Sequence, residues 1–220
     1  MRVSAIIPAL NAAATLSATL AALGGAVDEV VVADGGSGDG TVACAEAHGA
    51  RVVTGPRGRG AQLAAGIAAA RGRWLLLLHA DTRLATGWAG EVRDFMAGSE
   101  SRAGYFRFVL DSDDPRARRL ERLVALRCRA LALPYGDQGL LIARTLLDAV
   151  GGVRPLPLME DVELVRRIGR RRLVALDAAA VTSAARWEAD GWHVRSARNL
   201  ACLALYAAGV PPRMIATLYA

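Results

Sequence analysis

The most apolar segment of the chain ends in two polar side chains that could do chemistry. Residues 73–82 read RWLLLLHADT, so four leucines lead directly to His79 and Asp81. Such a run predicts a strand buried on both faces, and a plain turn after it would use Gly, Asn or Pro. A rigid strand that ends in an imidazole and a carboxylate predicts a ligand-binding tip, with Asp81 suited to a hard cation such as Mg²⁺ or Mn²⁺.

A third polar side chain, Asp34, ends the apolar run DEVVVAD and precedes the glycine-rich segment GGSGDGT. Its carboxylate either accepts hydrogen bonds from a ribose or a uracil, or forms an Asx turn. If these strands are parallel, Asp34, His79 and Asp81 emerge at one edge of the sheet, where open α/β sheets bind ligands. The segment GDGTVA is only a weak dinucleotide motif, because Asp34 would repel a pyrophosphate there.

Two later segments carry acids at positions suited to acceptor chemistry. In LMEDVEL, Glu160 and Asp161 begin a predicted helix, where they either complement the helix dipole or supply a general base for an acceptor hydroxyl. In PYGDQG, Asp137 and Gln138 either bind a polar substrate or form a tight turn.

A basic loop, TGPRGRGAQL, completes the candidate site. Arg57 and Arg59 flank glycines that permit close backbone approach, and Gln62 follows at a helix start. Contact with a diphosphate and a solvated basic loop are both compatible with this pattern.

The elements that must position these residues follow an α/β pattern. The first 80 residues alternate apolar strands with helices, which predicts a doubly wound, mainly parallel sheet with helices on both faces. Later segments predict helices at 87–98, 115–133 and 159–170 and strands at 103–111, 140–143 and 171–177. We expect one domain at residues 1–185 and a C-terminal helical arm at 186–220 packed on it.

Composition narrows the class of protein. Hydrophobic residues make up 53% of the 220 residues, which excludes wholesale disorder. All 27 basic residues are arginine and the net charge is +6, which favours anionic partners unless a GC-rich genome accounts for the arginines. Aromatic residues are only 5% and no basic run interleaves them, so we expect no nucleic-acid partner. The three cysteines match no zinc or disulfide pattern, and the N-terminus shows no signal peptide, which predicts a cytoplasmic protein.

Taken in order, these segments resemble the family 2 glycosyltransferases, which have a GT-A fold. The matching segments span residues 3 to about 165 and read VSAIIPALN, VVVADGGSGDGT, WLLLLHADT, PYGDQG and MEDVEL. The chain is most similar to small stand-alone bacterial members in which HAD replaces the usual Asp-x-Asp and an Arg-Trp pair recurs, here Arg186 and Trp187. Some of those relatives are associated with arsenosugar biosynthesis, and others carry names from carotenoid glycosylation.

The resemblance implies metal-dependent, inverting transfer of a sugar from a nucleotide diphosphate donor, with uridine favoured, to an acceptor hydroxyl. Asp161 matches the family's base, with Glu160 beside it, and Asp81 would hold Mg²⁺ or Mn²⁺ at the diphosphate. His79 departs from the usual Asp, so it either contacts the ribose or diphosphate or shapes the turn.

The other expected substrate contacts are assigned by segment. The acceptor side would include Asp137 and Gln138. Arg186 would pair a phosphate while Trp187 stacks on a sugar, unless they are an ordinary surface Arg and core Trp. The donor side would comprise Pro8, Ala9, Asn11, Asp34, Arg57, Arg59, Gln62, His79 and Ala80.

Two alternatives stay open at this stage. One is a non-catalytic protein of the same fold that binds nucleotide sugars or a membrane surface, and the other is a nucleotidyltransferase, which normally has an early glycine-rich stretch with a lysine. The arginine-rich helix 115–133 and the C-terminal arm leave peripheral contact with the inner face of the cell membrane, or a homodimer, open.

Overall fold

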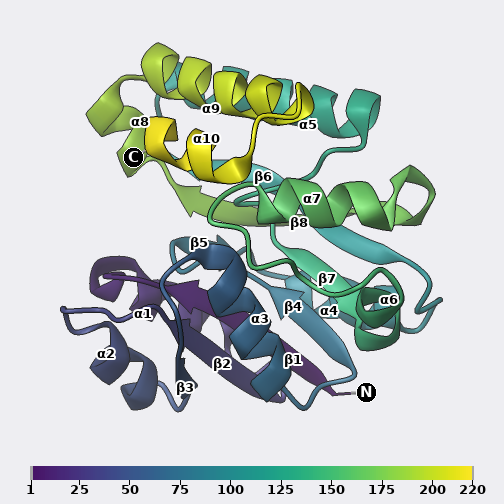
Figure 1. Cartoon of the computed structure of the whole chain (residues 1–220). Coiled ribbons are helices and arrows are strands. Elements are labelled where there is room, and N and C mark those ends of the chain that lie inside the picture. Colours follow the sequence, from purple (N-terminus) through teal and green to yellow (C-terminus); the bar gives the residue numbers. More distant parts are fainter. Residues whose placement is uncertain (1, 220) are drawn as a thin grey trace.

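The computed structural model describes residues 2–219 and contains one eight-stranded mixed sheet (Figure 1). The strand order is β3-β2-β1-β4-β7-β6-β8-β5. The strands are β1 Val3–Ala9, β2 Glu29–Asp34, β3 Arg51–Thr54, β4 Trp74–Leu77, β5 Thr82–Leu84, β6 Ala103–Asp111, β7 Leu140–Ala143 and β8 Leu173–Ser183. The helices are α1 Ala13–Leu23, α2 Thr41–Ala47, α3 Arg59–Ala69, α4 Trp88–Met96, α5 Pro115–Leu131, α6 Arg144–Ala149, α7 Glu160–Ile168, α8 Ala185–Asp190, α9 Trp192–Ala207 and α10 Pro212–Tyr219, with a 3₁₀ turn η1 at Arg170–Arg172.

The N-terminal half has the predicted doubly wound arrangement. Strands β3, β2, β1 and β4 are parallel neighbours, joined by α1, α2 and α3. Every residue of β1 and β4 is buried, which explains why their sequences are continuously apolar rather than alternating. The carboxyl ends of these strands therefore meet at one edge, as expected.

The second half explains how the later segments reach the same edge. Only β5 and β7 run against the direction of the other strands. Because β7 is antiparallel to β4, its beginning and not its end lies at the ligand edge, so the loop PYGDQG before it arrives there. The sequence did not predict β5, which has only three residues, and β8 continues to Ser183, six residues beyond the predicted end at Asp177.

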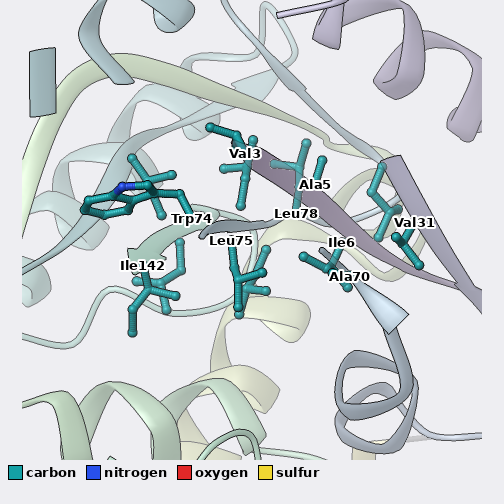
Figure 2. Packing of buried hydrophobic residues seen from close by; sticks show 14 of the residues in the cluster. Val3, Ala5, Ile6, Val31, Ala70, Trp74, Leu75, Leu78 and Ile142 are labelled. Carbon is teal, nitrogen blue, oxygen red and sulfur yellow. The ribbon is translucent and has the colours of Figure 1, made fainter. Parts of the chain in front are cut away.

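The core anchors the strands whose ends carry the candidate site. Figure 2 shows Ile6, Trp74 and Leu75 among the buried hydrophobic side chains of the core, and all three are fully buried. Trp74 also makes an edge-to-face contact with Phe95 of α4, with ring centroids 5.9 Å apart. Burying each such side chain contributes about 1.5–3 kcal/mol, so the leucine run of β4 holds the following HAD segment rigidly.

The C-terminal residues form helices, as their sequence indicated. Cys202 of α9 and Ile215 of α10 are buried against Met159 and Val162 at the start of α7. In residues 2–219, no helix is both long and apolar enough to cross a membrane. The division at residue 185 stays a prediction.

Candidate functional site

A cleft of about 510 Å³ lies at the carboxyl edge of the sheet. Predicted site residues gather in it from four separate parts of the chain: the end of β1, the basic loop before α3, the HAD segment after β4, and the start of α8. Ten of the predicted site residues line it: Pro8, Ala9, Asn11, Arg57, Arg59, Gln62, His79, Ala80, Asp81 and Arg186.

The loops after β1 and β2 are tied to each other at the cleft. Asn11 has a positive φ of 50°. Its side-chain oxygen accepts the Gly38 N–H at 2.9 Å, and its own N–H donates to the Ser37 hydroxyl at 2.9 Å. Asn tolerates this left-handed conformation better than most residues. The segment GGSGDG thus holds Asn11 in place through Ser37 and Gly38.

Asp34 forms a turn, which is one of the two roles that the sequence left open for it. Asp34 is 3% exposed, and its carboxylate accepts the N–H groups of Gly36 and Ser37 at 2.9 and 3.0 Å. Burial raises the pKa of Asp34, but hydrogen bonds from Ser37 and Gly36 outweigh burial and lower it overall. Asp34 is not among the cleft-lining residues, so its contact with a nucleoside stays a prediction while its hold on the loop is observed.

His79, Asp81 and Asp137 form a cluster with the composition of a metal site. Each offers one ligand atom, and these atoms lie within 4.8 Å of one another. Carboxylate oxygens suit both Mg²⁺ and Mn²⁺, and Mn²⁺ also accepts imidazole. The residues therefore fit a divalent ion. The sequence assigned Asp137 to the acceptor side, whereas the structure places it beside Asp81.

Both ring nitrogens of His79 in this cluster have hydrogen-bond partners. Its Nδ1 lies 2.7 Å from Asp137 Oδ1, and its Nε2 lies 3.3 Å from Nη1 of Arg59. A guanidinium only donates, so Nε2 accepts and Nδ1 carries the proton that is donated to Asp137. Burial raises the pKa of Asp137, but the His79 hydrogen bond and the charges of Arg59 and Arg186 outweigh it and lower the pKa to about 2. Asp137 is thus held ionised, as a metal ligand must be.

Arg59 links the cluster of His79, Asp81 and Asp137 to the acids of α7. Its Nε donates to Glu160 and its Nη2 donates to Asp161 at 3.0 Å, while Nη1 faces His79. Burial lowers the pKa of Arg59, but Asp161 and Glu160 outweigh burial and raise it, so the guanidinium remains charged. The sequence expected Arg59 to contact a diphosphate; in the structure its donors are directed mainly at acids.

The two acids of α7 have different environments. Glu160 is 1% exposed, and burial together with the charge of Asp161 raises its pKa despite the ion pair with Arg59. Asp161 Oδ2 accepts the Gly136 N–H at 2.7 Å as well as Arg59. Among the residues that the structure describes, its Oδ1 accepts only the Val162 N–H, at 2.7 Å. Oδ1 of Asp161 therefore accepts fewer hydrogen bonds than Oδ2, whereas Oε2 of Glu160 is buried and has no hydrogen-bond partner among the described residues.

Two of the predicted substrate contacts, Gln138 and Trp187, are buried in contacts within the protein, so a role toward a substrate stays a prediction for both. Gln138 is 3% exposed, and its amide group is used by the Phe106 carbonyl and by Arg127, both at 3.1 Å. Trp187 is buried against Phe108, so it is a core residue. The sequence could not distinguish a substrate contact from a buried structural position for these two residues, because Gln and Trp occur both in cores and in binding sites.

Gln62 lines the cleft but also holds the sheet. Its side-chain nitrogen donates to the carbonyls of Ala9 and Ala33, at 2.6 and 2.9 Å, where β1 and β2 end. Sequence reasoning missed several cleft residues, among which Ser183 and Ala185 follow the unpredicted extension of β8. The missed lining residues are Leu10, Ala12, Thr15, Gly58, Ser183 and Ala185.

Comparison with known proteins identifies the family and the fold. Residues 4–155, more than half of the chain, match the sequence model of glycosyl transferase family 2. The chain belongs to glycosyl transferase family 2. This glycosyltransferase has the GT-A fold that the sequence predicted. No curated protein sequence is detectably similar to it.

Solved structures of sugar-transferring enzymes share the fold. Glucosyl-3-phosphoglycerate synthase from Mycobacterium tuberculosis, crystallised with Mn²⁺, UDP and glucosyl-3-phosphoglycerate, has 21% identity and a TM-score of 0.56 over 83% of this chain and 70% of that chain. The same enzyme with Mg²⁺ and UDP has 20% identity and a TM-score of 0.60 over 83% and 69%. Mannosyl-3-phosphoglycerate synthase from Rubrobacter xylanophilus has 18% identity and a TM-score of 0.61 over 83% and 66%.

Proposed function

We propose that this glycosyltransferase moves a sugar from a nucleotide diphosphate donor to an acceptor hydroxyl, with a divalent ion and with inversion at the anomeric carbon. The observation that carries the proposal is the linkage of the His79, Asp81 and Asp137 cluster to Asp161 through the single guanidinium of Arg59. The ion site lies at the cleft, and Asp161 lines an adjoining pocket that also includes His79. An ion site linked in this way to a base matches the two demands of the reaction, which are a stabilised leaving group and a deprotonated acceptor.

The donor would lie along the ends of β1 and β4. Pro8, Ala9 and Asn11 offer a wall for the nucleoside, and the exposed Arg57 and the cleft-lining Arg186 supply positive charge for the diphosphate. Uridine is favoured by the family resemblance and by the UDP held in the M. tuberculosis enzyme structures. We also assign the chain to the stand-alone bacterial subgroup with HAD in the metal segment.

Asp81 and Asp137 would hold Mg²⁺ or Mn²⁺. When bound, such an ion neutralises charge on the departing diphosphate. His79 keeps Asp137 oriented through the 2.7 Å hydrogen bond. This division of labour explains how a histidine can stand where other family members carry an aspartate.

Asp161 would act as the base. The acceptor oxygen forms a bond to the anomeric carbon as the bond from that carbon to the diphosphate breaks, and the bonding pair leaves with the diphosphate. Asp161 takes the hydroxyl proton on Oδ1. Attack from the side opposite the leaving group inverts the configuration.

The three cysteines are free, in agreement with the proposed cytoplasmic location.

The experiment is a thermal-shift screen of nucleotide diphosphate sugars with and without Mn²⁺, followed by transfer assays on Asp161→Asn. We expect a donor that stabilises the protein only when Mn²⁺ is present. Asp161→Asn should abolish transfer while donor affinity stays within a few-fold. Asp94→Asn, at an exposed position on α4, is the matched control and should keep full activity.

Two results would contradict the proposal. Near-normal turnover by Asp161→Asn would remove the base assignment. Absence of stabilisation by every donor, with or without metal, would remove the donor and ion assignments together.

A further inference from the structure

The strongly exposed large hydrophobic side chains of residues 2–219 lie on three helices only. These are α5, α9 and α10, which Figure 1 shows together on the side of the molecule away from β1, β2 and β3. The side chains are 56–67% exposed, and they are Leu123, Leu126, Leu131, Val194, Leu200, Met214 and Leu218. We call these seven residues and the exposed residues between them the helical face. Single exposed apolar residues are ordinary, but their confinement to one side is the mark of an interaction surface.

Arginines alternate with leucines on the exposed side of α5. Arg119, Arg122 and Arg129 are exposed at spacings that place them beside Leu123 and Leu126 on one side of the helix. Within residues 2–219 these three arginines form no ion pair, whereas their neighbours Arg116 and Arg118 pair with Asp114 and Glu121. The exposed side of α5 is therefore both apolar and strongly positive.

A second group of arginines adjoins the end of α5. The Arg170 side chain donates to the carbonyls of Ala130 and Arg129, at 3.0 and 2.8 Å. This contact places the exposed run Arg170–Arg172 of η1 beside the last turn of α5. The positive charge of the helical face is thus extended by a separate part of the chain.

Helix α9 adds an exposed strip without charge. Its exposed positions from the second turn to the end are all apolar, and they are Ala197, Leu200, Ala201, Ala204 and Ala207. The first residue of α9, Trp192, packs with Ala117 of α5 and lies under the Arg116 guanidinium at 5.6 Å. The uncharged strip and the arginine-leucine side of α5 therefore belong to connected helices.

We propose that the helical face binds the surface of an anionic lipid bilayer. Apolar side chains enter the boundary between headgroups and acyl chains, while arginines extend from the same level to lipid phosphates. A second copy of the chain is a poorer occupant, because a two-fold contact through α5 would bring the unpaired arginines of both copies together. Membrane binding by the helical face does not depend on the sugar-transfer chemistry. No helix in residues 2–219 is long and apolar enough to span the bilayer.

The test is flotation of the full chain with lipid vesicles. We expect binding to vesicles of phosphatidylcholine with about one third phosphatidylglycerol, little binding to phosphatidylcholine alone, and weakening by salt. Each arginine near such a surface contributes about fivefold in partitioning, so Arg119→Gln with Arg122→Gln should reduce binding roughly twentyfold. The control pair, Arg93→Gln with Arg102→Gln, changes exposed arginines outside the helical face and should bind as the wild type does.

A second variant, Leu126→Gln, tests the apolar part at a position that is 61% exposed, so the substitution removes little buried surface. It should lower binding without changing the melting temperature or the donor-induced thermal shift. The proposal is overturned if the wild type ignores anionic vesicles, if the control pair loses as much binding as the test pair, or if Leu126→Gln instead dissociates a dimer in solution. Because donor binding is read separately, failure here leaves the proposed sugar transfer untouched.

Discussion

Arg59 carries more contacts with the candidate catalytic groups than any other side chain described above. It reaches Glu160, Asp161 and His79 with three different nitrogens. Such a fork-like arrangement depends on the planar shape of the guanidinium, and not only on its charge. Arg59 therefore holds the acids of α7 at a fixed position relative to the side-chain cluster that contains His79.

Replacing Arg59 by Lys should retain the positive charge and lose the planar arrangement of N–H donors. We expect kcat to fall about a hundredfold or more, since a misplacement of about 1 Å in a site can cost that much. Steady-state kinetics on Arg59→Lys, compared with Arg57→Lys, would measure the effect. Arg57 is exposed and its assigned role is donor binding, so its variant should mainly raise KM. An unchanged kcat in Arg59→Lys would show that Arg59 acts as a charge alone.

At the scale of elements, the site depends on how closely α3 approaches β1. A Cβ added to Gly66 would lie 2.6 Å from Cγ2 of Ile6 and 3.4 Å from the Cβ of Ala33. Ile6 is fully buried in the centre of the sheet, so it has no room to move. The glycine permits the close contact by which Gln62, one turn earlier, reaches the ends of β1 and β2.

Gly66→Ala should therefore destabilise the protein, even though alanine is the better helix former. We expect a loss of about 1–3 kcal/mol in the free energy of unfolding from overpacking, measured by urea denaturation. Gly90→Ala in α4 is the matched control, because the nearest atom to its added Cβ lies 3.9 Å away. That variant should gain up to about 1 kcal/mol. A neutral Gly66→Ala would indicate that α3 can shift without cost.

At the scale of the whole molecule, the C-terminal helices α9 and α10 pack against the start of α7, which carries the two acids. Ile215 of α10 is fully buried, in a cluster with Cys202 and with Met159, the residue immediately before Glu160. Met159 has a φ of 65°, an unusual conformation for a residue other than glycine. Packing against the C-terminal helices stabilises the start of α7 in that conformation.

Ile215→Ala should cost about 2–5 kcal/mol of stability by opening a cavity, which corresponds to a melting temperature lower by roughly 4–20 °C for a protein of this size. Differential scanning calorimetry would measure it. The neighbouring Met214→Ala is the control, since Met214 is 61% exposed and its loss removes little buried surface. Equal melting temperatures for the two variants would show that α10 is not part of the folded core.

The sequence by itself determined the α/β class, the edge at which His79 and Asp81 emerge, and most of the cleft lining. It could do so because buried parallel strands are continuously apolar and their ends share one edge, so local pattern and site position are coupled. The order of the motifs then indicated the family.

Only the tertiary structure decided which polar residues lie together. Asp137 joins Asp81 because β7 is antiparallel, Gln138 and Trp187 turn into the core, and Arg59 bridges to acids about one hundred residues further along the chain. Strand direction in a mixed sheet, and the side on which a polar residue points, depend on long-range packing. No local period in the sequence records either of them.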